Sequence, residues 1–90
     1  MMNREVEIVP EAGLHARPAS KFVETAGEFE CSLKIKDAGS EEEPVDARSM
    51  LAVTSLGLKQ GEKMEIIAEG DDAEKALDAL EEVITTPEGE

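Results

Sequence analysis

The spacing of the apolar residues changes along this chain between the two-residue period of β-strands and the wider period of α-helices. Residues 4–9 alternate polar and apolar side chains, which is typical of a half-buried strand. Apolar residues recur at helical spacing over residues 16–26, and Gly27 stands where a glycine commonly follows the last turn of a helix. The beginning of the chain is therefore predicted to form a strand and then a helix.

Three further strands and a short helix are predicted by the same reasoning. Alternation indicates strands over residues 31–36, 45–47 and 64–68, the second of which is a short edge strand. Ser49 is a suitable N-cap for a short helix that closes at Gly57.

The last predicted helix carries a continuous apolar stripe from Ala73 to Ile84. Asp71 and Glu74 have the spacing of a capping box, which satisfies free N–H groups at a helix start. Residues 85–90 are polar and are expected to form a flexible C-terminal tail. The predicted order of elements is strand, helix, strand, strand, helix, strand and helix.

Each predicted strand has one apolar face, and each predicted helix has one apolar stripe. The simplest arrangement that buries all of them is an α+β fold, in which helices cover one face of a four-stranded antiparallel sheet and water covers the other. Residues 1–90 are expected to form one domain, because 90 residues are too few for two independent cores.

Several features favour a cytoplasmic location. No apolar run reaches the roughly 18 residues that a membrane-spanning helix needs, and residues 1–5 lack the features of a signal peptide. Cys31 is the only cysteine, so no internal disulfide is expected, and we expect its side chain to be a small buried strand residue. We therefore expect a cytoplasmic protein that does not insert into membranes.

The chain is strongly acidic, with 22 Asp and Glu residues, 9 Lys and Arg residues and a net charge of −13. A non-specific nucleic-acid binder needs a basic surface, so this charge argues against nucleic acid as a partner. The apolar periodicity is too regular for a disordered acidic chain. We interpret the charge as a solvated surface suited to the salt-rich cytosol of a halophile, with residues 41–43 in a solvated turn.

His15, the only histidine, stands at the start of the first predicted helix, where backbone N–H groups lack partners. Pro18 has no N–H group, so those of Ala16 and Arg17 remain to bind an anion at the positive end of the helix dipole. The Arg17 guanidinium can add charge-assisted hydrogen bonds to a phosphate. These residues favour a phosphoryl group on the imidazole in a shallow, open site, while a surface or helix-capping histidine stays open as an alternative.

Other chemistries have less support. One histidine and one distant cysteine do not make a zinc site, and the sequence contains no glycine-rich phosphate loop. No nucleophile motif of the GxSxG type occurs. We therefore expect neither a metal nor a cofactor, and we expect a phosphotransfer intermediate more than a stand-alone enzyme.

The short helix after Ser49 has two interpretations. Ser49 is either an N-cap hydroxyl alone or also a phosphorylation site, because a helix start tolerates added negative charge. This helix has more apolar residues than a two-turn helix with a wet face needs, namely Met50, Leu51, Val53 and Leu56. Most of them are expected in the core, and one or two in an exposed docking patch beside His15.

The chain resembles HPr, the histidine-containing phosphocarrier protein of the bacterial sugar phosphotransferase system, over about residues 4–84. Residues 13–19 match the family's active-site signature, and residues 49–57 and 59–61 resemble its regulatory-serine segment. Residues 72–77 also have the look of the family. The resemblance implies an open-faced β-sandwich with strand order 1-4-2-3.

The resemblance also implies residue roles. His15 would accept a phosphoryl group on Nδ1, its pros nitrogen, from phosphorylated enzyme I and donate it to a sugar-specific enzyme IIA in phosphoenolpyruvate-dependent sugar uptake. Arg17 would assist the phosphohistidine. Ser49 matches the serine that a dedicated ATP-dependent HPr kinase modifies in some members.

For partner docking we expect contributions from Leu51, Arg48 and Lys21, in a protein that acts as a monomer. Basic residues near this surface are few, and residues 39–44 form a turn that is longer and more acidic than usual for the family. Two other functions stay open. One is an HPr-like carrier for a dihydroxyacetone kinase or a nitrogen-regulatory branch, and the other is a non-catalytic binding domain in which His15 only caps a helix.

Overall fold

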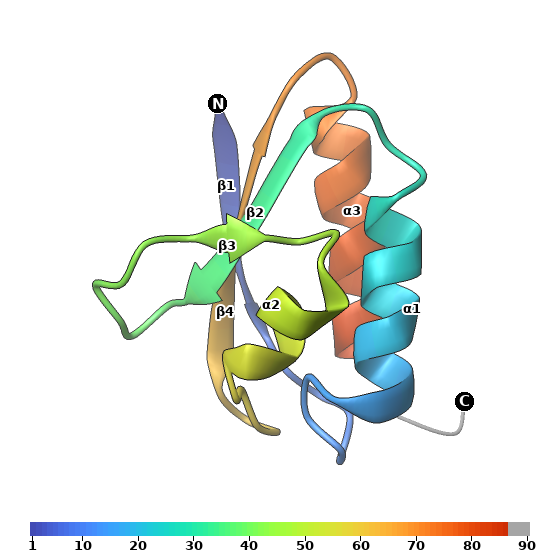
Figure 1. The fold of residues 1–90 in the computed structure, drawn as a ribbon. Helices are drawn as coiled ribbons and strands as arrows, with labels where there is room; N and C mark the ends of the chain where they lie inside the picture. The colour runs from blue at the N-terminus through green and yellow to red at the C-terminus, as the bar shows by residue number, and fades with distance from the viewer. Residues whose placement is uncertain (87–90) are drawn as a thin grey trace.

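The computed structural model describes residues 1–86 and contains four strands and three helices in the predicted order (Figure 1). The strands are β1 (Met2–Glu7), β2 (Ser32–Asp37), β3 (Val45–Asp46) and β4 (Lys63–Glu69). The helices are α1 (Ala16–Ala26), α2 (Met50–Ser55) and α3 (Ala73–Thr85).

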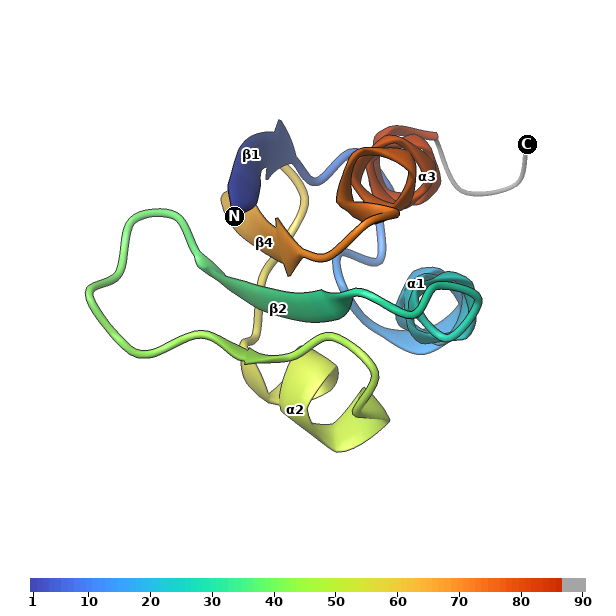
Figure 2. The same ribbon diagram turned by 90° about the horizontal axis from the view of Figure 1, so that it is seen from above.

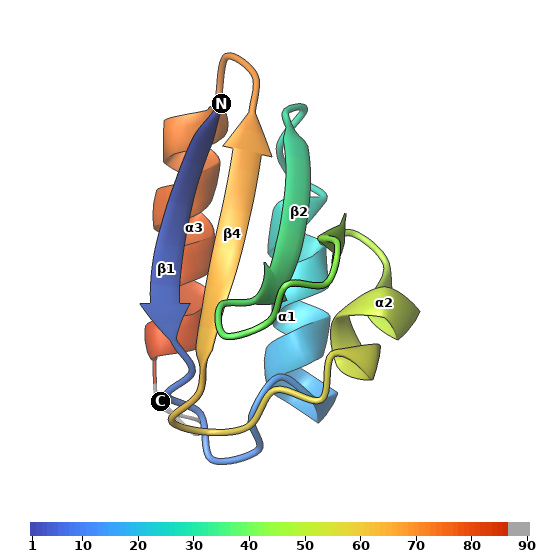
Figure 3. The same cartoon turned by 90° about the vertical axis from the view of Figure 1, so that its left-hand side faces the viewer.

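All strand pairs in the sheet are antiparallel, and the strand order is β1-β4-β2-β3. The register places Val6 opposite Met64 and Ile35 opposite Ile66, and all four side chains are buried. Because successive side chains of a strand point to opposite faces, these residues define one covered face. Figure 3 views the sheet from its open side, with the helices behind it.

Helices α1 and α3 lie side by side over the covered face, and α2 packs against α1 and β3 (Figure 2). Phe22 of α1 and Leu80 of α3 are fully buried and belong to the same apolar core as Ile66 of β4. The predicted fold, a four-stranded antiparallel sheet covered on one face by three helices, is confirmed. None of the helices within residues 1–86 combines the length and the apolar character that crossing a bilayer requires.

The first strand lies two residues earlier than predicted. It runs over Met2–Glu7, not over 4–9, because this segment pairs with β4 from Ala68 to Lys63. Ile8 is fully buried, but it hydrogen bonds outside the sheet ladder: its N–H donates to Glu62 O and its carbonyl accepts from Gly61 N–H. Alternation of side chains therefore located the strand but not its limits.

The predicted helix-end signals at Gly27 and Asp71 are wrong in detail. Gly27 follows α1 with a right-handed φ of −69°, so this helix end does not use a left-handed glycine. The N-cap of α3 is Asp72, and its side chain makes no capping bond, so no capping box of Asp71 and Glu74 closes this helix start. Instead the Asp72 carboxylate accepts hydrogen bonds from the backbone N–H groups before β2.

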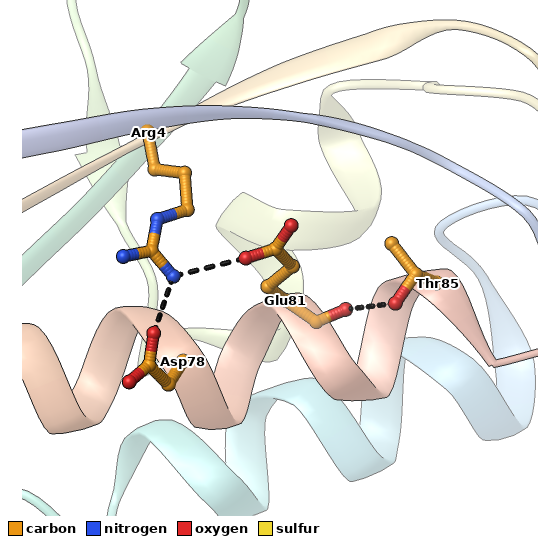
Figure 4. Close-up of polar contacts among 4 residues, drawn as sticks. All are labelled: Arg4, Asp78, Glu81 and Thr85. Atoms are coloured by element: carbon orange, nitrogen blue, oxygen red, sulfur yellow. Dashed lines mark hydrogen bonds and ion pairs between the residues drawn. The ribbon is translucent and has the colours of Figure 1, made fainter.

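The C-terminal segment was predicted as a tail over residues 85–90, but Thr85 is the last residue of α3. Its hydroxyl donates to Glu81 O at 2.7 Å, which continues the helical turn. Residues 87–90 lie outside the described residues. Near this end, the Arg4 guanidinium of β1 contacts Asp78 at 2.6 Å and Glu81 at 2.9 Å (Figure 4). These ion pairs fasten the edge strand to α3, and the hydrogen bond with Asp78 is the main cause that raises the pKa of Arg4.

Candidate functional site

His15 is the N-cap residue of α1, with an extended backbone at φ −139° and ψ 169°. It is partly exposed, and its side chain makes no capping hydrogen bond. A polar side chain at this position normally accepts a hydrogen bond from the second or third helical N–H. The imidazole therefore does not cap the helix.

The first turn of α1 presents two backbone N–H groups, those of Ala16 and Arg17, which as the first helical donors have no partner within the helix. The third helical residue, Pro18, has no N–H group, and the next N–H, that of Ala19, donates to His15 O at 3.3 Å. Two donors thus remain beside the imidazole at the positive end of the helix dipole. This is an arrangement suited to an anion.

Ala16 has a φ of 51° and is the only non-glycine residue among residues 1–86 with a positive φ. For a residue with a Cβ atom, this left-handed conformation costs about 1–2 kcal/mol. Such strain persists only where the surroundings hold it in place. The residues before His15 supply that constraint.

Gly13 and Leu14 anchor the segment that leads to His15. The Leu14 N–H donates to Leu58 O at 2.9 Å, and the Leu14 side chain is fully buried. Gly13 has a φ of 72°, and a Cβ atom there would lie only 2.7 Å from Leu58 O. Gly13 therefore allows a close approach to the backbone around Leu58. The segment before α1 is held against the segment after α2.

Two exposed basic side chains, Arg17 and Lys21, lie on the first turns of α1. Across the part of the chain that the structure describes, the ion pairs involve only Arg4 and Lys63 as cations. Arg17 is therefore available to an external anion, and Lys21 to a partner surface. Within residues 1–86, no group of three His, Cys, Asp or Glu side chains converges as a metal site would require.

Helix α2 begins at Ser49, whose hydroxyl oxygen accepts a hydrogen bond from Ala52 N–H at 3.2 Å. Leu51 is 81% exposed and Met50 is 40% exposed, while Val53 is fully buried. The structure therefore divides the apolar residues of this helix between the core and the surface. Because α2 packs against α1, the exposed pair lies on the element next to the helix that His15 begins.

Arg48, predicted as a docking residue, makes contacts within the chain. Its guanidinium donates to Phe29 O at 2.5 Å and to Cys31 O at 2.8 Å. These bonds tie the residues before α2 to the connection between α1 and β2. A docking role for Arg48 stays a prediction, and its guanidinium would serve that role only in addition to these bonds.

Two site-related features were missed from the sequence. Asp72 accepts from the N–H groups of Glu30 and Cys31, both at 3.0 Å, and Gln60 donates from its side-chain amide to Val9 O at 3.0 Å. The bonds to Asp72, with that from Glu30 first, lower its pKa, whereas burial is the main cause that raises the pKa of the Cys31 thiol. Cys31 is buried as predicted, although it precedes β2. Gln60 lies within residues 59–61, and their resemblance to the family's regulatory-serine segment was the indication in the sequence that this region matters.

Comparison with known proteins gives concordant results. A family model described as "PTS HPr component phosphorylation site" matches residues 2–86. The chain is 58% identical over 87 residues to the phosphocarrier protein HPr of Haloferax volcanii, with 97% of each chain covered. It is also 33% identical to the multiphosphoryl transfer protein of Salmonella typhimurium, where the match covers 100% of this chain and 24% of that longer protein.

Solved structures are similar over nearly the whole fold. HPr-C-His from Thermoanaerobacter tengcongensis matches with a TM-score of 0.85 and 39% identity, over 93% of this chain and 91% of that chain. The phosphocarrier protein HPr of Bacillus anthracis matches with a TM-score of 0.84 and 35% identity, over 92% of this chain and 95% of that chain. The family match over residues 2–86 includes the α1 start that carries His15.

Proposed function

This chain belongs to the HPr family, the phosphocarrier proteins of the phosphotransferase system, and on that premise we propose that His15 is the residue that carries the phosphoryl group. Proteins of this family work with enzyme I and enzyme IIA. In our proposal, His15 Nδ1 receives the phosphoryl group from phosphorylated enzyme I and passes it to a sugar-specific enzyme IIA.

The first transfer moves a phosphoryl group from one imidazole to another. The lone pair of neutral His15 Nδ1 attacks the phosphorus, and the P–N bond to the donor histidine breaks. The electron pair of that bond returns to the donor ring, so no oxidant or cofactor is consumed. The second transfer repeats this exchange, with phosphorylated His15 as donor and a histidine of enzyme IIA as acceptor.

The start of α1 supports both steps. The N–H groups of Ala16 and Arg17 can donate to the phosphoryl oxygens, and the Arg17 guanidinium can neutralise part of their charge. Phosphoryl transfer relies mainly on such positioning and charge stabilisation. Because His15 is partly exposed at the start of α1, either partner can approach it in turn.

One observation carries the proposal: the N-cap side chain of α1 leaves the helix donors unused, although α1 is a helix of 11 residues that a cap would stabilise. A histidine with only a structural cap role would make a capping bond. The acidic surface and the relative from Haloferax volcanii support the further proposal that these transfers take place at high salt.

The test uses radiolabelled phosphoenolpyruvate and enzyme I. Wild-type protein should gain an acid-labile label, and His15→Ala should gain none, because the chain has no other histidine. The variant should melt within about 1 kcal/mol of wild type, since a partly exposed side chain is removed. Undiminished labelling of the folded variant would refute the role of His15. Adding candidate acceptors to the labelled protein then separates sugar-specific enzyme IIA from other acceptors.

A further inference from the structure

The segment that leads from β1 to His15 lies alongside the segment that joins α2 to β4, at the lower end of the molecule in Figures 1 and 3. Backbone hydrogen bonds hold both ends of this contact. Ile8 N–H donates to Glu62 O at 2.9 Å and Ile8 O accepts from Gly61 N–H at 2.8 Å, while Leu14 N–H donates to Leu58 O at 2.9 Å. Between them, Val9 N–H donates to Ile84 O at 3.0 Å, so the segment is held by α3 up to Val9 and next by the bond of Leu14.

The segment between Ile8 and Leu14 contains a tight turn. Gly13 N–H donates to Pro10 O at 2.9 Å, so residues 10–13 form a turn that delivers Leu14 and His15. The peptide before this turn joins Val9 to Pro10, and it has a carbonyl but no N–H group. Its orientation sets the direction in which the turn leaves β1, and its carbonyl is the polar group through which that orientation can be held.

Gln60 holds this carbonyl. Its side-chain amide donates to Val9 O at 3.0 Å. Gln60 itself lies in a second turn, which is closed by Glu62 N–H donating to Lys59 O at 3.0 Å and by the Glu62 carboxylate accepting from Lys59 N–H at 2.7 Å. The amide therefore extends from a fixed backbone, although the side chain is exposed.

We infer that Gln60 is a positioning residue for phosphoryl transfer, which keeps His15 in register with the free N–H groups of α1 by fixing the peptide between Val9 and Pro10. This inference rests on the proposed function of His15. It assigns a role in transfer to a side chain that lies on a different connection from His15 and does not touch the phosphoryl group. Misplacing a reacting group by about 1 Å is enough to slow a transfer that depends on alignment.

The experiment measures transfer from phosphorylated enzyme I to three variants of the full chain. Gln60→Met keeps the length of the side chain but removes the donor without adding charge. Gln60→Glu removes the donor and adds a carboxylate. Asn3→Asp is the matched control, because Asn3 also donates from its side-chain amide, to Glu65 at 2.8 Å, far from His15 on β1.

Both Gln60 variants should lower the rate constant of transfer by about two- to tenfold, the range expected for the loss of one hydrogen bond. The carrier concentration at half-maximal rate should stay unchanged, and the melting temperature should fall by no more than the loss of one exposed hydrogen bond accounts for. Asn3→Asp should match wild type in both kinetic quantities, although its melting temperature should fall because the new carboxylate faces Glu65. A merely structural role for Gln60 would change the melting temperature and leave the rate constant alone.

Wild-type rate constants in Gln60→Met would overturn the inference, and so would an equal fall in Asn3→Asp. Failure of the proposed function has a different signature, because wild-type protein would then take no label at all. In that case the exchange of the Gly13 and Leu14 amide protons still decides whether Gln60 fixes the turn: unchanged protection in Gln60→Met would overturn the positioning role.

Discussion

Helices α1 and α2 both begin after an extended residue with a polar side chain, His15 in one and Ser49 in the other. Ser49 uses its hydroxyl oxygen to accept from Ala52 N–H, the third helical donor. His15 makes no such bond, and the third residue of α1 is Pro18, which has no N–H group to offer. At α2 the N-cap side chain satisfies the third helical donor, whereas at α1 the N-cap side chain makes no such bond and the third helical residue offers no donor.

The difference shows how a helix start becomes a site. A capping side chain at α1 would compete with a ligand for the N–H groups of Ala16 and Arg17. Pro18 removes the donor that a cap would most often use, and the left-handed Ala16 stores strain that a purely structural helix start would avoid. At α2 Ser49 satisfies the third donor, and the apolar Leu51 is left on the surface.

Reversing the charge of Arg17 at the start of α1 should have the largest effect on phosphoryl transfer. Arg17→Glu replaces an attraction for phosphate by a repulsion, so transfer in both directions should slow by about ten- to hundredfold. Its melting temperature should change little, because Arg17 is exposed. Lys75→Glu is the matched control, since it makes the same charge change on the exposed face of α3. Equal transfer rates for both variants would mean that the backbone donors suffice alone.

Removing the N-cap of α2 should have a moderate effect, and this effect should be on stability instead of on transfer. Ser49→Ala should destabilise the fold by about 1 kcal/mol through loss of the bond to Ala52, while transfer continues at the wild-type rate constant. Ser49→Asp should keep the stability, because Asp is also a good N-cap. If α2 borders the docking surface, the added charge should raise the concentration of enzyme I needed for half-maximal transfer. Denaturant unfolding measures the stability of both variants, and transfer kinetics on the same samples measure the effect on docking. Wild-type kinetics for Ser49→Asp would mean that Ser49 acts only as a helix cap.

The local features of both helix starts could be predicted from the sequence. The stripe of Ala19, Phe22 and Ala26 with Pro18 in the first turn gave the limits of α1, and Ser49 with Gly57 gave α2. Strand order could not be obtained from alternation, because side-chain period is the same for every pairing; it came from the family resemblance.

Side chains that bind distant backbone groups were missed. Asp72 bonds to a residue 41 positions away and Gln60 to one 51 positions away. Arg48 was predicted only as a docking residue, and its carbonyl partner at Cys31 lies 17 positions away. Local patterns carry no information on such contacts, because they depend on which segments the tertiary fold brings together.

The start of α3 differs from the starts of α1 and α2. A substitution there should have the smallest of the predicted effects, a change in melting temperature. Its N-cap carboxylate, Asp72, bonds to the N–H groups of Glu30 and Cys31 instead of those of its own helix. These bonds favour the ionised form, so the pKa of Asp72 in the folded protein lies below its ordinary value near 4. A lowered folded-state pKa means that this carboxylate stabilises the fold above pH ~4 and that the contribution disappears as the pH falls through the folded pKa.

Asp72→Asn should therefore melt at a lower temperature than wild type at pH 7, because a neutral amide oxygen accepts these bonds more weakly. The difference in melting temperature should shrink as the pH is lowered from about 5 to about 2, since wild type then loses the charge that the variant never had. Asp71→Asn is the matched control: Asp71 is exposed, and its substitution should leave the melting temperature unchanged at every pH. A difference between Asp72→Asn and wild type that stays constant over this range would show that shape, not charge, holds the connection between α1 and β2 against α3.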